Sequence, residues 1–154
     1  GVRVLDHESE HDGQGASGWF DFDQDGYLDL LSPNDGSPNT LFRNNGDETF
    51  TDVTKNRQPP SGVPLFNVGN ANGVCLGDID NDGDIDVYFP NADQGNRLIR
   101  NDLKETGAAQ FTGDMGGARG CTMADYDNDG YLDIYVNNGG LSNVLFNDIT
   151  DPDF

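Results

Sequence analysis

The 154-residue chain has few basic residues. It carries 8 lysines and arginines against 28 aspartates and glutamates, which gives a net charge of −20 at pH 7. The sequence contains no basic run, and its acidity argues against nucleic acid or an anionic membrane as a partner. No apolar stretch approaches the roughly 20 residues that a membrane-spanning helix needs. We therefore expect neither nucleic-acid binding nor membrane insertion.

Histidine is also scarce, and no nucleophile and base stand out as a pair. The two histidines, His7 and His11, are close together, flank acidic residues and belong to no group of metal ligands. The paired carboxylates of the chain are better explained as metal ligands than as acid–base catalysts. We therefore expect no enzymatic activity.

The chain has two cysteines, Cys75 and Cys121, each within a short apolar run. Cys75 lies three residues, and Cys121 four residues, before an aspartate that opens an acidic stretch, so they are not at equivalent positions. Free cysteine behaves as a small hydrophobe and is often buried. We favour two small buried residues in packed strands over a disulfide between them. Two cysteines do not fix the redox compartment.

Aspartate is concentrated in three stretches that share the pattern D-x-D-x-D-G-x-x-D and begin at Asp21, Asp78 and Asp125. Carboxylates at positions 1, 3 and 5 of a tight loop can converge on one point, and glycine at position 6 permits the required backbone conformation. Calcium takes about six to eight oxygen ligands. Two carboxylates about 5 Å apart repel by roughly 0.8 kcal/mol even in water. Three copies of the pattern therefore predict three calcium loops rather than three acidic turns.

The loops mark an internal repeat. The spacing from Asp21 to Asp78 is longer than the spacing from Asp78 to Asp125, so the connections between repeats vary in length. An asparagine that opens an apolar pair nevertheless follows each leading aspartate at one constant offset, as Asn39, Asn96 and Asn143. A constant offset within repeats of variable length indicates a structural unit. In the middle repeat we expect the extra residues to form a turn over Lys104–Gln110.

Each repeat is expected to form about four short antiparallel strands, with the acidic loop between the first and second strands. No segment has a convincing helical period. A hairpin is predicted from Thr40–Asn44 and Glu48–Thr54, closed by Asn45-Gly46. The other expected strands are Trp19-Phe20 before the first loop and, after the three loops, Leu28–Leu31, Ile85–Phe89 and Leu132–Val136. Beyond the last aspartate these strands are apolar on both faces, so we expect each sheet to be covered on both sides.

The pattern differs from that of helical calcium loops. EF-hand and dockerin loops need an acidic residue at position 12 and flanking helices. Position 12 is occupied here by Ser32, Phe89 and Val136, and the flanks are β-like.

The sequence resembles the FG-GAP-like or VCBS repeats that form β-propeller blades of the integrin α type. The resemblance rests on Gly77–Asp86, Ala124–Asp133 and Asn39–Thr54, and it covers the chain apart from the N-terminal stretch 1–15 and Lys55–Asn72. It implies calcium ligation by the side chains at positions 1, 3, 5 and 9 and by the carbonyl at position 7. In this sequence those ligands are Asp21, Asp23, Asp25, Asp29 and the Tyr27 carbonyl, then Asp78, Asp80, Asp82, Asp86 and the Asp84 carbonyl, then Asp125, Asp127, Asp129, Asp133 and the Tyr131 carbonyl. The FG and GAP signatures themselves are absent, so integrin-like partner binding is not implied.

We expect one all-β repeat domain over 1–154, with three four-stranded antiparallel propeller-type blades at 16–54, 73–112 and 120–154. Propellers typically have about four to eight blades. Three blades therefore predict an incomplete ring or an open head-to-tail array.

The two ends of the chain lie at one phase of the repeat. Phe154 stands at the repeat position of Phe50, and Gly1–Leu5 could supply the strand that would follow it. Residues 1–15 are thus expected to complete the blade of a neighbouring copy, unless the chain is a segment of a longer repeat protein.

The expected function is a secreted, calcium-stabilised structural or adhesion module that associates with copies of itself or with a protein partner. Extracellular calcium modules often bind the ion with dissociation constants of about 10⁻⁴–10⁻³ M. One alternative is a calcium-dependent glycan-binding module, with sugars stacked on Tyr27, Tyr88, Tyr131 and Tyr135. Tyr88 and Tyr135 share one repeat position, however, which favours packing between blades. A further alternative is a non-catalytic segment of a polysaccharide-active enzyme.

Overall fold

The structure is a computed structural model that describes residues 15–34, 39–54, 70–93, 95–101, 107–110 and 117–147. Within these ranges the regular secondary structure consists of short β-strands, in agreement with the all-β prediction. No helix in this part of the chain is long and apolar enough to cross a membrane.

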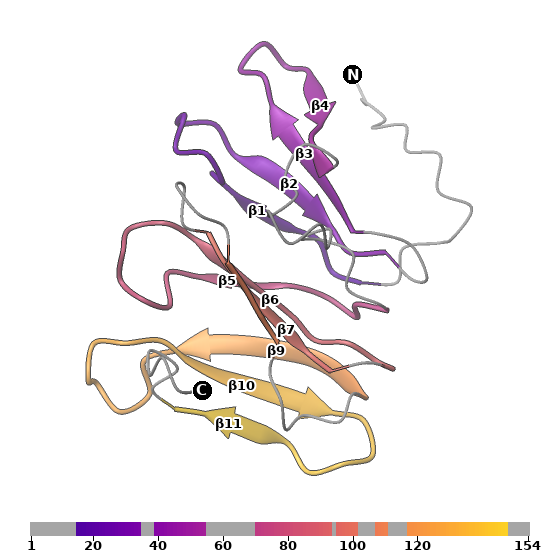
Figure 1. The fold of residues 1–154 in the computed structure, drawn as a ribbon, viewed down its shortest axis with the longest axis vertical. Coiled ribbons are helices and arrows are strands. Elements are labelled where there is room, and N and C mark those ends of the chain that lie inside the picture. Colours follow the sequence, from indigo (N-terminus) through magenta and orange to yellow (C-terminus); the bar gives the residue numbers. More distant parts are fainter. Residues whose placement is uncertain are drawn as a thin grey trace.

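The strands form three antiparallel sheets that follow one another along the chain (Figure 1). The first sheet contains β1 (Gly18–Phe20), β2 (Asp29–Ser32), β3 (Thr40–Asn44) and β4 (Phe50–Asp52). The second contains β5 (Cys75–Gly77), β6 (Asp86–Phe89), β7 (Arg97–Arg100) and β8 (Gly107–Gln110). The third contains β9 (Ala118–Ala124), β10 (Asp133–Asn138) and β11 (Val144–Phe146).

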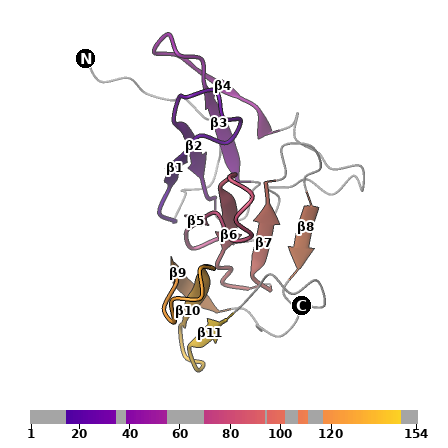
Figure 2. The same cartoon turned by 90° about the vertical axis from the view of Figure 1, so that its left-hand side faces the viewer.

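Within each sheet the strands are neighbours in chain order, as Figure 2 shows for the second sheet. Each acidic loop joins the first strand of its sheet to the second, as predicted. The three sheets are stacked and form no closed ring among the described residues (Figure 1). The fourth strand expected near Phe154 and the strand expected at Gly1–Leu5 lie outside the described residues.

Two predicted boundaries are wrong. The turn expected over Lys104–Gln110 is wrong for its last four residues, which form β8 and pair with β7. The strand expected over Glu48–Thr54 begins only at Phe50. Gly46 and Glu48 have φ angles of +73° and +67°, which belong to a turn rather than to a strand.

The constant offset between leading aspartate and asparagine has a structural cause. The Oδ1 atom of Asn39 accepts a hydrogen bond from the amide of Asn34 at 2.8 Å. The same bond joins Asn96 to the amide of Asn91 at 2.7 Å, and Asn143 to the amide of Asn138 at 2.9 Å. Each bond closes the connection between the second and third strands of its sheet, so the spacing is fixed by a local polar contact.

Two apolar cores lie between the sheets. Phe20, Leu31 and Leu41 of the first sheet pack in one cluster with Val87 and Phe89 of the second. Because side chains alternate along a strand, Val87 and Phe89 face the first sheet and the residue between them faces the third.

That residue, Tyr88, is fully buried with Leu98 against Ile134 and Val136 of the third sheet. The second sheet is therefore covered on both faces, as predicted. The third sheet is not, because Tyr135 on β10 is 41% exposed on the face that points away from the second sheet.

A disulfide joins Cys75 on β5 to Cys121 on β9, so the expectation of two separate buried cysteines is wrong. Their Cα atoms are 6.0 Å apart, and both side chains pack against the core between the second and third sheets. Positions three and four residues before a loop point to opposite faces of a strand. The one-residue difference in offset therefore turns Cys75 toward the third sheet and Cys121 toward the second.

Candidate metal-binding loops

The three acidic loops have the same backbone conformation. At position 4 the φ angle is positive in all three loops, with Gln24 at 57°, Asn81 at 59° and Asn128 at 63°. At position 6 the glycines have φ angles of 92° (Gly26), 95° (Gly83) and 95° (Gly130). Left-handed backbone at position 6 is easily adopted only by glycine, which explains its place in the pattern.

The leading aspartate closes each loop. In the first loop, Asp21 accepts the amide of Asp25 on Oδ1 at 3.0 Å and the amide of Gly26 on Oδ2 at 2.8 Å. Asp78 and Asp125 accept the equivalent pairs of amides at 3.0–3.1 Å. These bonds hold one end of each loop.

The aspartate at position 9 ties the loop to two strands. Asp29 accepts the amide of Phe22 at 3.0 Å and the amide of Asn44, at the end of β3, at 2.7 Å. Asp86 accepts the amides of Ile79 and Asn101 at 2.9 and 2.8 Å. In the third loop, the position-9 aspartate accepts the equivalent amide of the loop start at 3.0 Å.

Burial disfavours the charged form of two position-9 carboxylates, those of Asp29 and Asp86. Desolvation raises the pKa of Asp29, and it raises the pKa of Asp86 to about 6, although the backbone hydrogen bonds act in the opposite direction. A nearby cation would remove this penalty, because it favours the charged form of each carboxylate.

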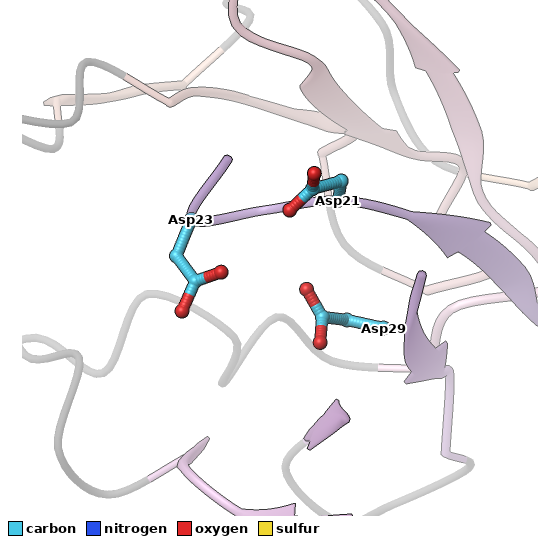
Figure 3. A group of neighbouring side chains, drawn as sticks. All are labelled: Asp21, Asp23 and Asp29. Carbon is cyan, nitrogen blue, oxygen red and sulfur yellow. The ribbon is translucent and has the colours of Figure 1, made fainter. Parts of the chain in front are cut away.

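Oxygen atoms of three aspartates converge in each loop. Each group offers one carboxylate oxygen per residue, and these atoms lie within 4.8 Å of one another. The groups are Asp21, Asp23 and Asp29, then Asp78, Asp80 and Asp82, then Asp125, Asp127 and Asp133. Figure 3 shows the first group, in which the three carboxylates face one another.

The remaining predicted ligands are not part of these three groups. Asp25 and Asp129 at position 5, and Asp86 at position 9, fall outside them. Ligation by these side chains, and by the carbonyls of Tyr27, Asp84 and Tyr131, stays a prediction.

One atom shows that the first loop fits a cation. Asp23 Oδ1 is buried and has no hydrogen-bond partner among the described residues, although its carboxylate belongs to the converging group. A buried polar atom without a partner is costly, and a metal ion would satisfy it. Because all the converging donors are carboxylate oxygens, the groups suit a hard cation such as calcium.

The sequence interpretation missed three side chains that contact the position-3 carboxylates. Arg43 donates from Nε to Asp23 at 2.6 Å and from Nη2 to Asp25 at 2.7 Å. In the other loops, Arg100 Nε lies 3.9 Å from Asp80 Oδ2, and Asn147 donates to Asp127 at 3.3 Å. All three residues lie at one constant offset from their leading aspartate, so the comparison of offsets that identified Asn39 would also have found them.

Neighbouring loops contact each other directly. Gln24, at position 4 of the first loop, donates to the Gly83 carbonyl at 3.1 Å and also to the Asp84 carboxylate. Asn81, at position 4 of the second loop, donates to the Gly130 carbonyl at 2.9 Å. The same contact thus links the first loop to the second and the second to the third.

The comparison with protein families agrees with this repeat. A model of the FG-GAP-like repeat matches residues 21–89 and 78–136. The chain belongs to the FG-GAP-like repeat family. Each matched segment begins at a leading aspartate and ends in the strand after the following loop, β6 or β10.

A stretch of 72 residues of this FG-GAP-like chain is 35% identical to cartilage acidic protein 1 of Xenopus tropicalis. The aligned stretch covers 46% of this chain and 10% of that relative. The similarity therefore concerns a small part of a much longer protein.

Proposed function

We propose that this FG-GAP-like module is a calcium-stabilised structural or adhesion unit that works outside the cell. The observation that carries the proposal is the convergence of three carboxylate oxygens within 4.8 Å in each of three equivalent loops. Carboxylates this close repel one another. A divalent cation between them attracts each carboxylate, and this attraction outweighs their mutual repulsion.

The chain's own residues explain how an ion would stabilise the fold. The position-9 aspartate joins the second strand to the loop start and, in the first two sheets, to the end of the third strand. An ion held with the leading aspartate would thus fix three strands of one sheet at a single point. At ten times its dissociation constant, each site would add about 1.4 kcal/mol of stability. We propose a structural rather than a catalytic role for this metal.

The proposal includes association with a further sheet of the same kind. Tyr126, Tyr135 and Leu145 form an exposed apolar face on the third repeat. Their equivalents in the second repeat are buried against the third sheet. The third sheet thus carries a surface suited to a following blade, which a second copy in head-to-tail order or a longer parent chain would supply.

An extracellular location fits two features. The Cys75–Cys121 disulfide is of a kind that persists in oxidising compartments. Calcium outside the cell is concentrated enough to fill sites of modest affinity.

The test is thermal unfolding of the chain in calcium chloride, in magnesium chloride and in EDTA. We expect calcium to raise the melting temperature well above the value in EDTA, and magnesium to have less effect. The control is a triple variant with Asp23→Asn, Asp80→Asn and Asp127→Asn, which should lose most of the calcium response. Identical melting in calcium and in EDTA would contradict the proposal.

A further inference from the structure

The contact between Arg43 and the first loop places a fixed positive charge at a candidate calcium site. Its guanidinium binds Asp23 and Asp25 through two separate nitrogens, at 2.6 and 2.7 Å. These are the aspartates of positions 3 and 5, both expected to ligate calcium. A guanidinium stays protonated over the whole physiological pH range, so the charge is permanent.

The equivalent side chain differs from loop to loop. Arg100 lies at 3.9 Å from the position-3 carboxylate of the second loop, which is a looser contact than that of Arg43. In the third loop the position is taken by Asn147, which donates a hydrogen bond to Asp127 and carries no charge. The three loops thus share one acidic pattern but differ in the side chain beside it, which is charged in the first two loops and neutral in the third.

We propose that the residue at this shared offset from each leading aspartate sets the calcium affinity of its loop. Arg43 makes the first loop the weakest site, Arg100 gives the second an intermediate affinity, and Asn147 makes the third the strongest. This inference rests on the proposed calcium binding.

The physical reason is competition between cations for the same carboxylates. Arg43 neutralises part of the charge that would attract calcium, and it repels the divalent ion once that ion is bound. An exposed ion pair contributes little stability of its own, so the repulsion dominates. A monovalent charge near a calcium ion changes its affinity by about tenfold at the dielectric of water.

Asparagine at this position allows the effect of the positive charge to be tested apart from the effect of the hydrogen bond to the carboxylate. Asn147 holds the position-3 carboxylate by a hydrogen bond, as Arg43 does, but without a positive charge. An exchange between the two residues therefore changes the charge near each loop and keeps a donor for its carboxylate. The double variant with Arg43→Asn and Asn147→Arg also leaves the net charge of the chain unchanged.

The backbone amide of the position-6 glycine can report on calcium binding in each loop. The amides of Gly26, Gly83 and Gly130 donate to the leading aspartates at 2.8, 3.0 and 3.1 Å. Their signals in ¹H–¹⁵N correlation spectra should respond to calcium at the adjacent carboxylate. A calcium titration of the full chain then gives one midpoint for each loop.

We expect the Gly130 signal to respond at the lowest calcium concentration and the Gly26 signal at the highest. Arg43→Asn should lower the midpoint at Gly26 about tenfold. Asn147→Arg should raise the midpoint at Gly130 by a similar factor, and it remains an independent test if Arg43→Asn does not fold. Arg119→Asn is the matched control. The side chain of Arg119 lies over Gly139, which follows the end of β10, whereas the third acidic loop precedes the start of that strand.

Unchanged midpoints in both loop variants would overturn the inference. It would also fail if Arg43→Asn weakened calcium binding at Gly26, because the arginine would then act as a support for Asp23. If calcium changed none of the three glycine signals in any variant, the proposed function itself would be wrong.

Discussion

The second and third sheets present the same side chains to different surroundings. Tyr88 on β6 and Tyr135 on β10 occupy one repeat position, yet Tyr88 is 0% exposed and Tyr135 is 41% exposed. Leu98 and Leu145 occupy another shared position, with exposed fractions of 1% and 47%. The residue types are identical in both pairs, so the difference comes from their surroundings, in which the third sheet covers Tyr88 and Leu98.

The comparison shows that an apolar side chain at these positions can pack against another sheet but does so only where such a sheet is present. A tyrosine or leucine at these positions specifies a face that can be covered. Whether the face is covered depends on a second sheet, which contributes Ile134 and Val136 in one case. Residues at equivalent repeat positions should therefore contribute unequally to the free energy of unfolding. The contribution should be large for residues between the second and third sheets and small for residues on the outer face of the third sheet.

The largest expected effect comes from the covalent link between these two sheets. The Cys75→Ala, Cys121→Ala double variant loses a disulfide whose cysteines are 46 residues apart in the chain. We expect the free energy of unfolding to fall by about 3–4 kcal/mol, because the unfolded chain regains the entropy of that loop. Urea unfolding in calcium measures this loss. A loss below about 1 kcal/mol would show that the bond does not constrain the unfolded chain as assumed.

A pair of leucine substitutions tests the comparison directly. Leu98→Ala removes a buried side chain and leaves a cavity between the second and third sheets, at a cost of about 3 kcal/mol. Leu145→Ala removes the same atoms from an exposed position and should cost less than about 1 kcal/mol. Urea unfolding of both variants, at a protein concentration where the chain is monomeric, gives the two values. Equal losses would mean that the outer face of the third sheet is covered in solution.

An effect smaller than the losses expected at the disulfide and at Leu98 is a pH dependence of the ion-free protein. The pKa of Asp86 is about 6 in the fold and near 3.8 in the unfolded chain. Its burial therefore costs nothing below about pH 4 and costs most above about pH 6, so the free energy of unfolding in EDTA should fall as the pH rises between these values. We expect a fall of about 1–2 kcal/mol, because one pKa unit corresponds to about 1.4 kcal/mol and solvent near the loop screens part of the cost.

Asp86→Asn is the control for this pH effect and should flatten the profile, although it also weakens one backbone hydrogen bond. Saturating calcium should reverse the trend, since only the ionised carboxylate binds the ion. Stability that rises with pH in EDTA would contradict the assignment.

Much of each repeat was predictable because local chemistry decides it. The D-x-D-x-D-G-x-x-D pattern fixes a loop whose glycine has positive φ, and Asn39 closes a connection within its own sheet. Thr40–Asn44 has the bounds expected for the third strand. These features depend on contacts between residues of the same repeat, so a single repeat contains all the information they need.

The missed contacts join residues from different strands or repeats. The shared offset of Arg43, Arg100 and Asn147 marks a repeat position in the sequence, but the ion pairs of Arg43 depend on the place of β3 beside the loop. The disulfide joins two different repeats. Because Cys75 and Cys121 lie three and four residues before their loops, their side chains point to opposite faces of their strands and meet between the two sheets. Pairings of this kind need the arrangement of the sheets, which the repeat pattern does not encode.

The number of acidic loops, their backbone form and the β-character of the repeats follow from the order of the residues, because turn geometry and carboxylate spacing are local properties. The fold is needed to tell which of the equivalent side chains are buried, which cysteines meet and which loops have a cation beside them. Burial, disulfide bonding and electrostatic competition are set by neighbours in space. In this chain, equivalent positions such as Tyr88 and Tyr135 have different neighbours.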